Sequence, residues 1–255
     1  MNLAKILETF RCGIGKSKNA SGHSSFFHSS LSYSACVIRR KAKTICVLKC
    51  MAEAAMEKLG AAGMGWALIH VGNLANRNDF IVAGAKDFEY ERSLYSETKR
   101  GWPDLRELPE KEVRDRYSSA WCHGGPGIGL SRATLPPAHC NVAEIMDIKR
   151  AIDPIRTSPL SPTDCLCHGE IGNIDLLIAG TAPLREAELW ELAKRRASGA
   201  LLRRRTIGSW RCGAIANVPV PGLLTGLAGI GYGLLRCCEP ETFPAILSLE
   251  APRRR

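Results

Sequence analysis

The amino-acid sequence predicts an all-α fold of helical hairpins that stack side by side. Three observations support this prediction. Apolar residues in several segments recur at helical spacing, no alternating pattern of convincing strand length is present, and a glycine motif recurs four times before an apolar run.

Three charged segments have the spacing of amphipathic helices. The first covers 79–96, with Asn78 or Asp79 as its N-cap, and the second covers 141–153. The third covers 183–205, with Thr181 as a candidate cap. It ends in basic residues, which suit a helix C-terminus.

A Gly-x-x-Gly motif starts at Gly60, Gly124, Gly169 and Gly226, and an apolar run follows each copy. The intervals between the copies can each hold a more polar helix with its loops. Glycine lets the chain turn tightly and lets two backbones approach closely. We therefore expect the apolar helix of each hairpin inside the fold and the charged helix outside it.

The basic charge of the chain is concentrated near its N-terminus. The 255 residues carry a formal net charge of +10, and residues 1–50 hold nine lysines and arginines but only one acid, Glu8. That segment is rich in serine and poor in apolar periodicity, so we predict a poorly structured extension over 1–50 and a folded domain over 51–255. The nearly balanced charge of the domain predicts no nucleic-acid partner. The alternative is a basic arm at 1–50 that contacts nucleic acid or a membrane surface.

Composition also indicates the cellular compartment of the protein. No run of about 18 apolar residues occurs, so we expect no transmembrane segment. The 11 cysteines are an odd number, and no convincing signal peptide opens the chain. We expect a reducing cytoplasm, where cysteine more often serves metal binding or catalysis than disulfide formation.

Cysteine and histidine precede two of the glycine motifs. Cys122 stands before one copy, and Cys167 with His168 stands before the next. If the repeats are equivalent, these three side chains converge. Two thiolates and one imidazole suit zinc and leave a fourth position for water or substrate. An incoming thiol would be deprotonated there and would stay nucleophilic, because two thiolates already neutralise the ion.

Two other interpretations of these residues remain open. The first is a structural zinc site in which Cys165 or Cys212 supplies the fourth ligand. The second is a set of buried thiols without a metal, since free cysteine often packs as a small apolar residue.

The motifs together resemble the C-terminal, LanC-like cyclase region of bacterial class II lanthionine synthetases, the LanM type. The resemblance spans residues 55–250, and its order and spacing are specific. It rests on WCHGGPGIGL at 121–130, LCHGEIGN at 166–173, WRCG at 210–213, PGLLTGLAGIGYGLL at 221–235, YERSLY at 90–95 and WPDL at 102–105.

The resemblance implies an α/α toroid of seven helical hairpins around a zinc ion, of which about four are visible here. It implies Cys122, Cys167 and His168 as the zinc ligands. The implied reaction adds a cysteine of a ribosomally made precursor peptide to dehydroalanine or dehydrobutyrine. This forms the thioether ring of a lantibiotic, in the bacterial cytoplasm.

The sequence departs from the family in two ways. The family's proposed acid/base histidine falls at Leu59, and leucine cannot transfer a proton, so His123 is the candidate substitute. The dehydratase domain and the earlier hairpins are not visible, so a partner chain would supply them. The alternatives are a non-catalytic, zinc-stabilised module that binds peptides or thiols, and a fragment that is a non-functional remnant.

Overall fold

The computed structural model describes residues 60–105, 117–213 and 218–251, all within one compact unit, Thr44–Arg255. The extension expected over 1–50 lies outside the described residues, and the boundary at residue 50 stays a prediction. Within the described ranges the fold is helical, and extended pairing is limited to an isolated bridge between Ser96 and Gly101. The all-α prediction is confirmed.

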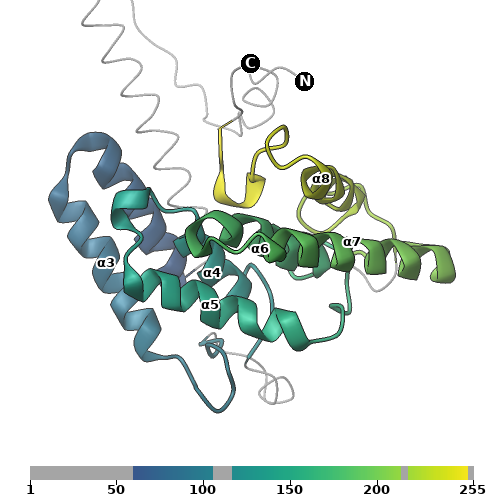
Figure 1. Cartoon of the computed structure of the whole chain (residues 1–255), viewed down its shortest axis with the longest axis horizontal. Coiled ribbons are helices and arrows are strands. Elements are labelled where there is room, and N and C mark those ends of the chain that lie inside the picture. Colours follow the sequence, from purple (N-terminus) through teal and green to yellow (C-terminus); the bar gives the residue numbers. More distant parts are fainter. Residues whose placement is uncertain (1–59, 106–116, 214–217, 252–255) are drawn as a thin grey trace, which may run out of the picture. The chain divides into compact units, whose positions relative to one another are not determined.

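A helix that includes residues 60–75 comes first in the described chain. Six further helices and two short 3-10 turns follow (Figure 1). They are α3 (Asn78–Ser93), α4 (Gly125–Ala133), η2 (Pro137–His139), α5 (Val142–Thr157), α6 (Glu170–Leu184), α7 (Glu188–Ile207), α8 (Leu227–Cys238) and η3 (Ile246–Ser248). None of the described helices is both long and apolar enough to cross a membrane.

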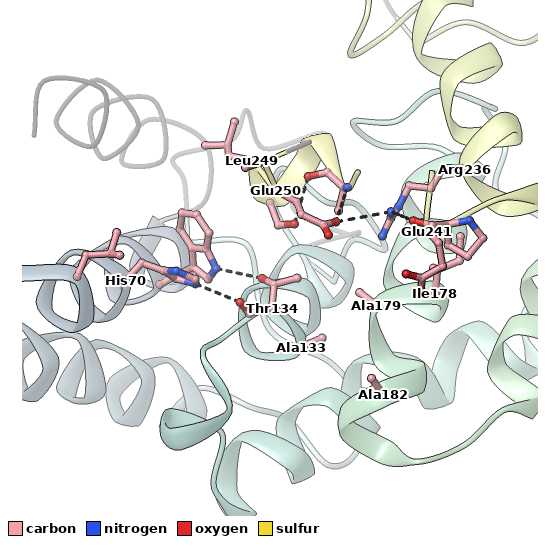
Figure 2. Close-up of a pocket in the computed structure, with 16 residues that line it drawn as sticks. His70, Ala133, Thr134, Ile178, Ala179, Ala182, Arg236, Glu241, Leu249 and Glu250 are labelled. Carbon is pink, nitrogen blue, oxygen red and sulfur yellow. Dashed lines mark hydrogen bonds and ion pairs between the residues drawn. The ribbon is translucent and has the colours of Figure 1, made fainter. Parts of the chain in front are cut away.

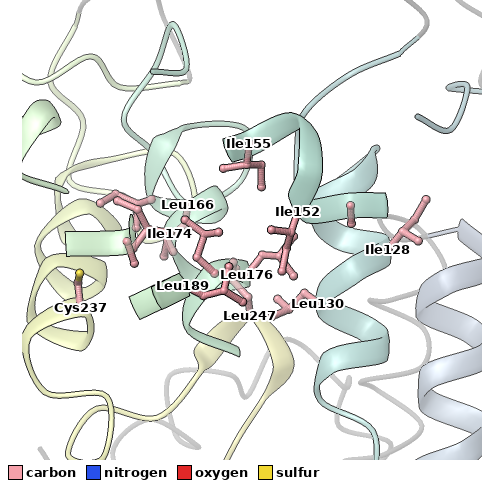
Figure 3. Packing of buried hydrophobic residues seen from close by; sticks show 14 of the residues in the cluster. Ile128, Leu130, Ile152, Ile155, Leu166, Ile174, Leu176, Leu189, Cys237 and Leu247 are labelled. Atoms are coloured by element: carbon pink, nitrogen blue, oxygen red, sulfur yellow. The ribbon is translucent and has the colours of Figure 1, made fainter. Parts of the chain in front are cut away.

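The helices pair as inner and outer members of hairpins. Helix α6 packs against α4 on one side and α8 on the other, while α5 covers α4 and α7 covers α6. Figure 3 shows the core that these helices enclose. Ile171, Ile174, Leu176 and Leu177 of α6 are at most 1% exposed, so this helix is the centre of the described fold.

Glycine begins three of the inner helices in the same way. Gly124, Gly169 and Gly226 are the N-caps of α4, α6 and α8. A Cβ atom on any of them would collide with the backbone of the preceding loop. The loop can therefore fold back closely onto the start of its helix only when these positions lack a side chain. The expected equivalence of these three repeats is confirmed.

Buried arginines join the helices to one another. Arg132 of α4 is fully buried and lies 2.7 Å from Glu91 of α3, while Arg196 of α7 lies 2.5 Å from Glu170 of α6. Removal of one partner from such a pair leaves an uncompensated buried charge, which costs about 3–5 kcal/mol. These pairs therefore fix how the hairpins align along their axes.

The predicted helix over 183–205 is wrong at its start. Pro183 belongs to the last turn of α6, and the chain reverses at Arg185, which has a left-handed backbone. Helix α7 begins only at Glu188. Pro183 has no N–H to donate to the Ala179 carbonyl, which weakens this last turn, and the helix ends one residue later at Leu184. Thr181 does not cap α7, since its hydroxyl donates to the Leu177 carbonyl within α6.

The cap predicted for α3 is also wrong. Arg77 occupies the N-cap position, and no side chain caps that helix end. Helix α3 ends at Ser93 rather than at residue 96, because Ser96 pairs with Gly101. Helix α5 begins at Val142, close to the predicted start at 141, but runs on to Thr157, beyond the predicted end at 153. Asn141 accepts a hydrogen bond from the Ala143 amide and forms a capping box with Glu144.

This contrast predicts different effects of two asparagine substitutions. Asn141→Ala should lower the free energy of unfolding by about 1 kcal/mol, because the cap of α5 is lost. Asn78→Ala is the matched control and should change it by less than about 0.5 kcal/mol. Urea denaturation of both variants measures the difference. An equal loss in the two variants would contradict the assignment of the caps.

Candidate metal centre

The structure brings Cys122, Cys167 and His168 together. Cys122 lies in the loop before α4, and the other two lie in the loop before α6. Their ligand atoms all lie within 4.8 Å of one another. Cys167 is 9% exposed, so the group is partly shielded from solvent. Among the described residues no other cluster of histidine, cysteine or carboxylate has this spacing.

Backbone hydrogen bonds between loops place the two thiols. The Cys122 amide donates to the Cys167 carbonyl at 3.3 Å, which ties the loop before α4 to the loop before α6. The Cys167 amide donates to the Leu224 carbonyl at 2.9 Å, which adds the loop before α8. The two sulfur atoms are therefore held by three neighbouring loops, each anchored on its own helix.

The orientation of the His168 ring is set by a third segment. Its Nε2 lies 3.0 Å from the Gly213 carbonyl oxygen, which can only accept, so Nε2 carries the proton. In the neutral form of the ring, Nδ1 is then the nitrogen that can bind a metal ion. Metal-binding histidines in proteins are commonly oriented through such a bond on their other nitrogen. Gly213 also has no room for a side chain, because a Cβ there would collide with the His168 ring and lie 2.7 Å from the Cys165 sulfur.

The side chains of the cluster lie close enough to shift one another's pKa values. A hydrogen bond with the Cys122 side chain, together with burial, raises the pKa of the Cys167 thiol well above its usual range. Hydrogen bonds with Cys165 and Cys167 raise the pKa of His168 to about 10. Two neighbouring thiols resist ionising together unless a cation compensates their charge. A divalent metal ion is such a cation, and it would replace the protons that the cluster otherwise retains.

The donor set fits zinc. Two sulfur atoms and one imidazole nitrogen are ligands that zinc prefers, and three protein ligands match its open, catalytic type of site. Cys165 and Cys212 are not members of the cluster. Cys165 instead forms a hydrogen bond with the His168 side chain. Although burial raises the pKa of its thiol, hydrogen bonds from His168 and Thr163 outweigh that effect and lower it.

His123 lies directly beside the cluster. Its Nδ1 is 2.9 Å from the Cys122 sulfur, and its side chain is partly exposed. The position allows the ring to reach a molecule bound near the three ligands. Leu59, where the resemblance placed the family's acid/base histidine, lies outside the described residues.

Sequence reasoning did not assign a role to Gly213 or Asp164. Gly213 belongs to the WRCG motif, which was a signal for the family but not for a contact with His168. The Asp164 carboxylate accepts from the Arg211 amide at 2.9 Å and pairs with Arg203. It thereby fixes the loop of residues 161–169 to the segment that carries Gly213.

Inner helices that begin at glycine caps, with two thiols and an imidazole before them, define a LanC-type helical domain with a candidate metal centre. The family model of lanthionine synthetase C-like proteins matches residues 60–248. The chain therefore belongs to the lanthionine synthetase C-like family.

A longer bacterial protein is similar in sequence to this chain. The chain is 26% identical over 194 residues to the lacticin 481/lactococcin biosynthesis protein LcnDR2 of Lactococcus lactis subsp. lactis. The aligned part covers 69% of this chain but only 20% of that relative. The chain thus spans about a fifth of its length.

Proposed function

We propose that this domain catalyses zinc-dependent formation of thioether rings in a ribosomally made precursor peptide. The observation that carries the proposal is the convergence of Cys122, Cys167 and His168 in a member of the lanthionine synthetase C-like family. In this proposal the three side chains hold the metal ion through two sulfur atoms and the Nδ1 of the imidazole. When bound, zinc supplies the positive charge that keeps a peptide cysteine in its thiolate form at neutral pH.

The remaining chemistry is an addition without net oxidation or reduction. The cysteine sulfur forms a bond to the β-carbon of dehydroalanine or dehydrobutyrine, and the double bond is consumed. The α-carbon then takes up one proton, so the thiol proton is balanced in the product. His123 is the proposed donor of that proton, because its ring lies beside Cys122 and is partly open to solvent.

The proposed partners follow from the substrate. A dehydrated precursor peptide must come from a dehydratase, and a partner chain would supply that activity and further hairpins. The LcnDR2 protein is about five times as long as the region that aligns with this chain, which supports additional domains in such systems. The proposed location is the bacterial cytoplasm, where thiols stay reduced.

A second candidate function is a non-catalytic, zinc-stabilised module that binds peptides or thiols. It is favoured by Leu59, which stands where the family's proposed acid/base histidine is expected. A third reading, the non-functional remnant, predicts that the domain does not hold zinc. The following experiments separate the three.

The first prediction concerns metal content. The purified chain should hold about one zinc ion, which Cys122→Ala and Cys167→Ala should each remove, because two remaining ligands bind zinc weakly. Cys238→Ala is the matched control, since Cys238 is exposed and outside the cluster. Elemental analysis after dialysis measures the ratio. A folded chain without zinc would leave the remnant as the better reading.

The second prediction concerns Gly213. Gly213→Ala should weaken zinc binding at least tenfold, since its Cβ would displace the His168 ring and its hydrogen bond. Gly231→Ala in α8 is the control, because no atom lies within 4 Å of its Cβ position. Competition with a chelator measures both affinities. Equal affinities would show that Gly213 does not orient the ring.

The third prediction concerns catalysis by His123. With a pre-dehydrated peptide, the zinc-loaded chain should form thioether rings, detected by mass spectrometry after thiol alkylation. His123→Phe should slow ring formation about 100-fold or more, while zinc content stays the same. His139→Phe is the control, because His139 contacts Asn73 rather than the cluster. Unchanged ring formation in His123→Phe would exclude the proposed proton donor, and a zinc-loaded chain that forms no rings would support the binding module.

A further inference from the structure

Outer helix α7 holds the loop that carries two of the three candidate metal ligands. Arg196 and Arg203 stand seven residues apart on α7, which places them on the same face of this helix. Both arginines donate to backbone carbonyls in the loop between α5 and α6. The two arginines have different partners there, and only one set of partners leads to the metal cluster.

Arg196 binds the start of this loop. It is 7% exposed and donates to the Ser158 and Pro159 carbonyls at 3.1 and 3.2 Å. It also pairs with the buried Glu170 carboxylate in the first turn of α6. Its hydrogen-bond partners lie between residues 155 and 170, so Arg196 joins α5, α6 and α7 to one another.

Arg203 binds the later part of the loop, close to the candidate ligands. It donates to the Ser161 carbonyl at 2.7 Å from one terminal nitrogen and pairs with the Asp164 carboxylate through the other. Asp164 precedes Cys167 by only three residues. The Asp164 side chain is 1% exposed, so Arg203 compensates a buried negative charge at this point of the loop.

Asp164 in turn holds the segment that orients the imidazole of the cluster. The Asp164 amide donates to the Arg211 carbonyl at 2.8 Å, and the Arg211 amide donates back to the Asp164 carboxylate at 2.9 Å. Gly213 follows two residues later, and its carbonyl accepts from Nε2 of His168 at 3.0 Å. A continuous series of contacts therefore runs from Arg203 on α7 to the His168 ring.

We propose that Arg203 is a positioning residue of the candidate metal centre. It keeps the Asp164 carboxylate directed at the Arg211 amide, and it thereby fixes the Gly213 carbonyl that orients His168. A buried carboxylate without its cation is destabilised, so it draws in water or turns away from the amide. The segment before Gly213 is then held by one bond fewer, and the ring loses its fixed acceptor. This inference rests on the proposed function, because it takes the cluster to be a zinc site.

Zinc affinity and metal geometry test the proposal in the full chain. Arg203→Met should weaken zinc binding about tenfold in competition with a chelator, at the lower end of the effect usual for groups that orient a metal-binding histidine. Arg203→Lys keeps a positive charge beside Asp164 and should restore most of the affinity. Asp164→Asn should weaken binding about fivefold, because arginine binds a neutral amide about half as strongly as a carboxylate. The d–d absorption of bound Co²⁺, which reports ligand geometry, should change in Arg203→Met and not in Arg203→Lys.

Two control variants separate positioning from stability. Arg204→Met changes the neighbouring, exposed arginine of α7 and should leave zinc affinity and the Co²⁺ absorption unchanged. Asn141→Ala lowers the stability of the domain through the cap of α5 and should also leave both unchanged. Full zinc affinity in Arg203→Met and Asp164→Asn would overturn the proposal. An equal loss of affinity in Asn141→Ala would overturn it too, because general destabilisation would then explain the effect.

A measurement without metal separates this proposal from the proposed function. In the metal-free chain the Nε2 proton of His168 should exchange slowly by NMR, because it is bonded to the Gly213 carbonyl. It should exchange at least tenfold faster in Arg203→Met, and Asp164→Asn takes the place of that variant if it does not fold. A chain that binds no zinc but shows this difference would contradict the proposed function and support the positioning role. Equal exchange rates would overturn the positioning role, whether or not zinc binds.

Discussion

The contact between each inner helix and the loop before it is the constraint on which the rest of the described structure depends. At Gly124, Gly169 and Gly226 the loop backbone lies where any other residue would place its Cβ. Each loop therefore has a fixed position relative to the first turn of its helix. Since α4, α6 and α8 pack as neighbours, their loops meet, and loop residues at similar places in the repeat come together. The cluster of Cys122, Cys167 and His168 is a direct result of this repetition.

The common direction of the inner helices gives the domain two electrostatically different ends. Helix N-termini lie beside the thiols, and a positive helix end favours a thiolate over a thiol. Helix C-termini lie at the opposite end, where Ala133, Ala182 and Arg236 line a cavity (Figure 2). Buried pairs such as Arg236 with Asp175 hold the helices in the alignment that keeps these ends apart.

How much of the site could be predicted from sequence depends on how far apart in the chain its contacting residues lie. Asn141 as a cap could be predicted, because the capping box is local to four residues. The convergence of Cys122, Cys167 and His168 could be predicted as well, because the glycine motif sets the register between each loop and its helix. The bond from His168 to Gly213 could not, since it joins positions 45 residues apart without a shared pattern. The N-cap at Arg77 and the start of α7 at Glu188 were missed because no capping side chain marks either helix start. The cavity could not be predicted from the sequence, because its wall combines the ends of several helices with the segment after α8.

Metal binding and catalysis make different demands on this fold. The three proposed ligands come from the loops before two adjacent helices, α4 and α6, and Leu224 and Gly213 support them from the next loop. All of these residues are described, and the core around α6 is buried, so the candidate metal centre draws its ligands and their supports from three neighbouring repeats. Ring formation needs, in addition, a proton donor and a surface that binds the peptide. Helix α8 leaves Leu227 and Leu235 39% and 52% exposed at one edge of the repeat. Zinc binding should therefore survive changes that abolish catalysis, so metal content and ring formation must be measured separately.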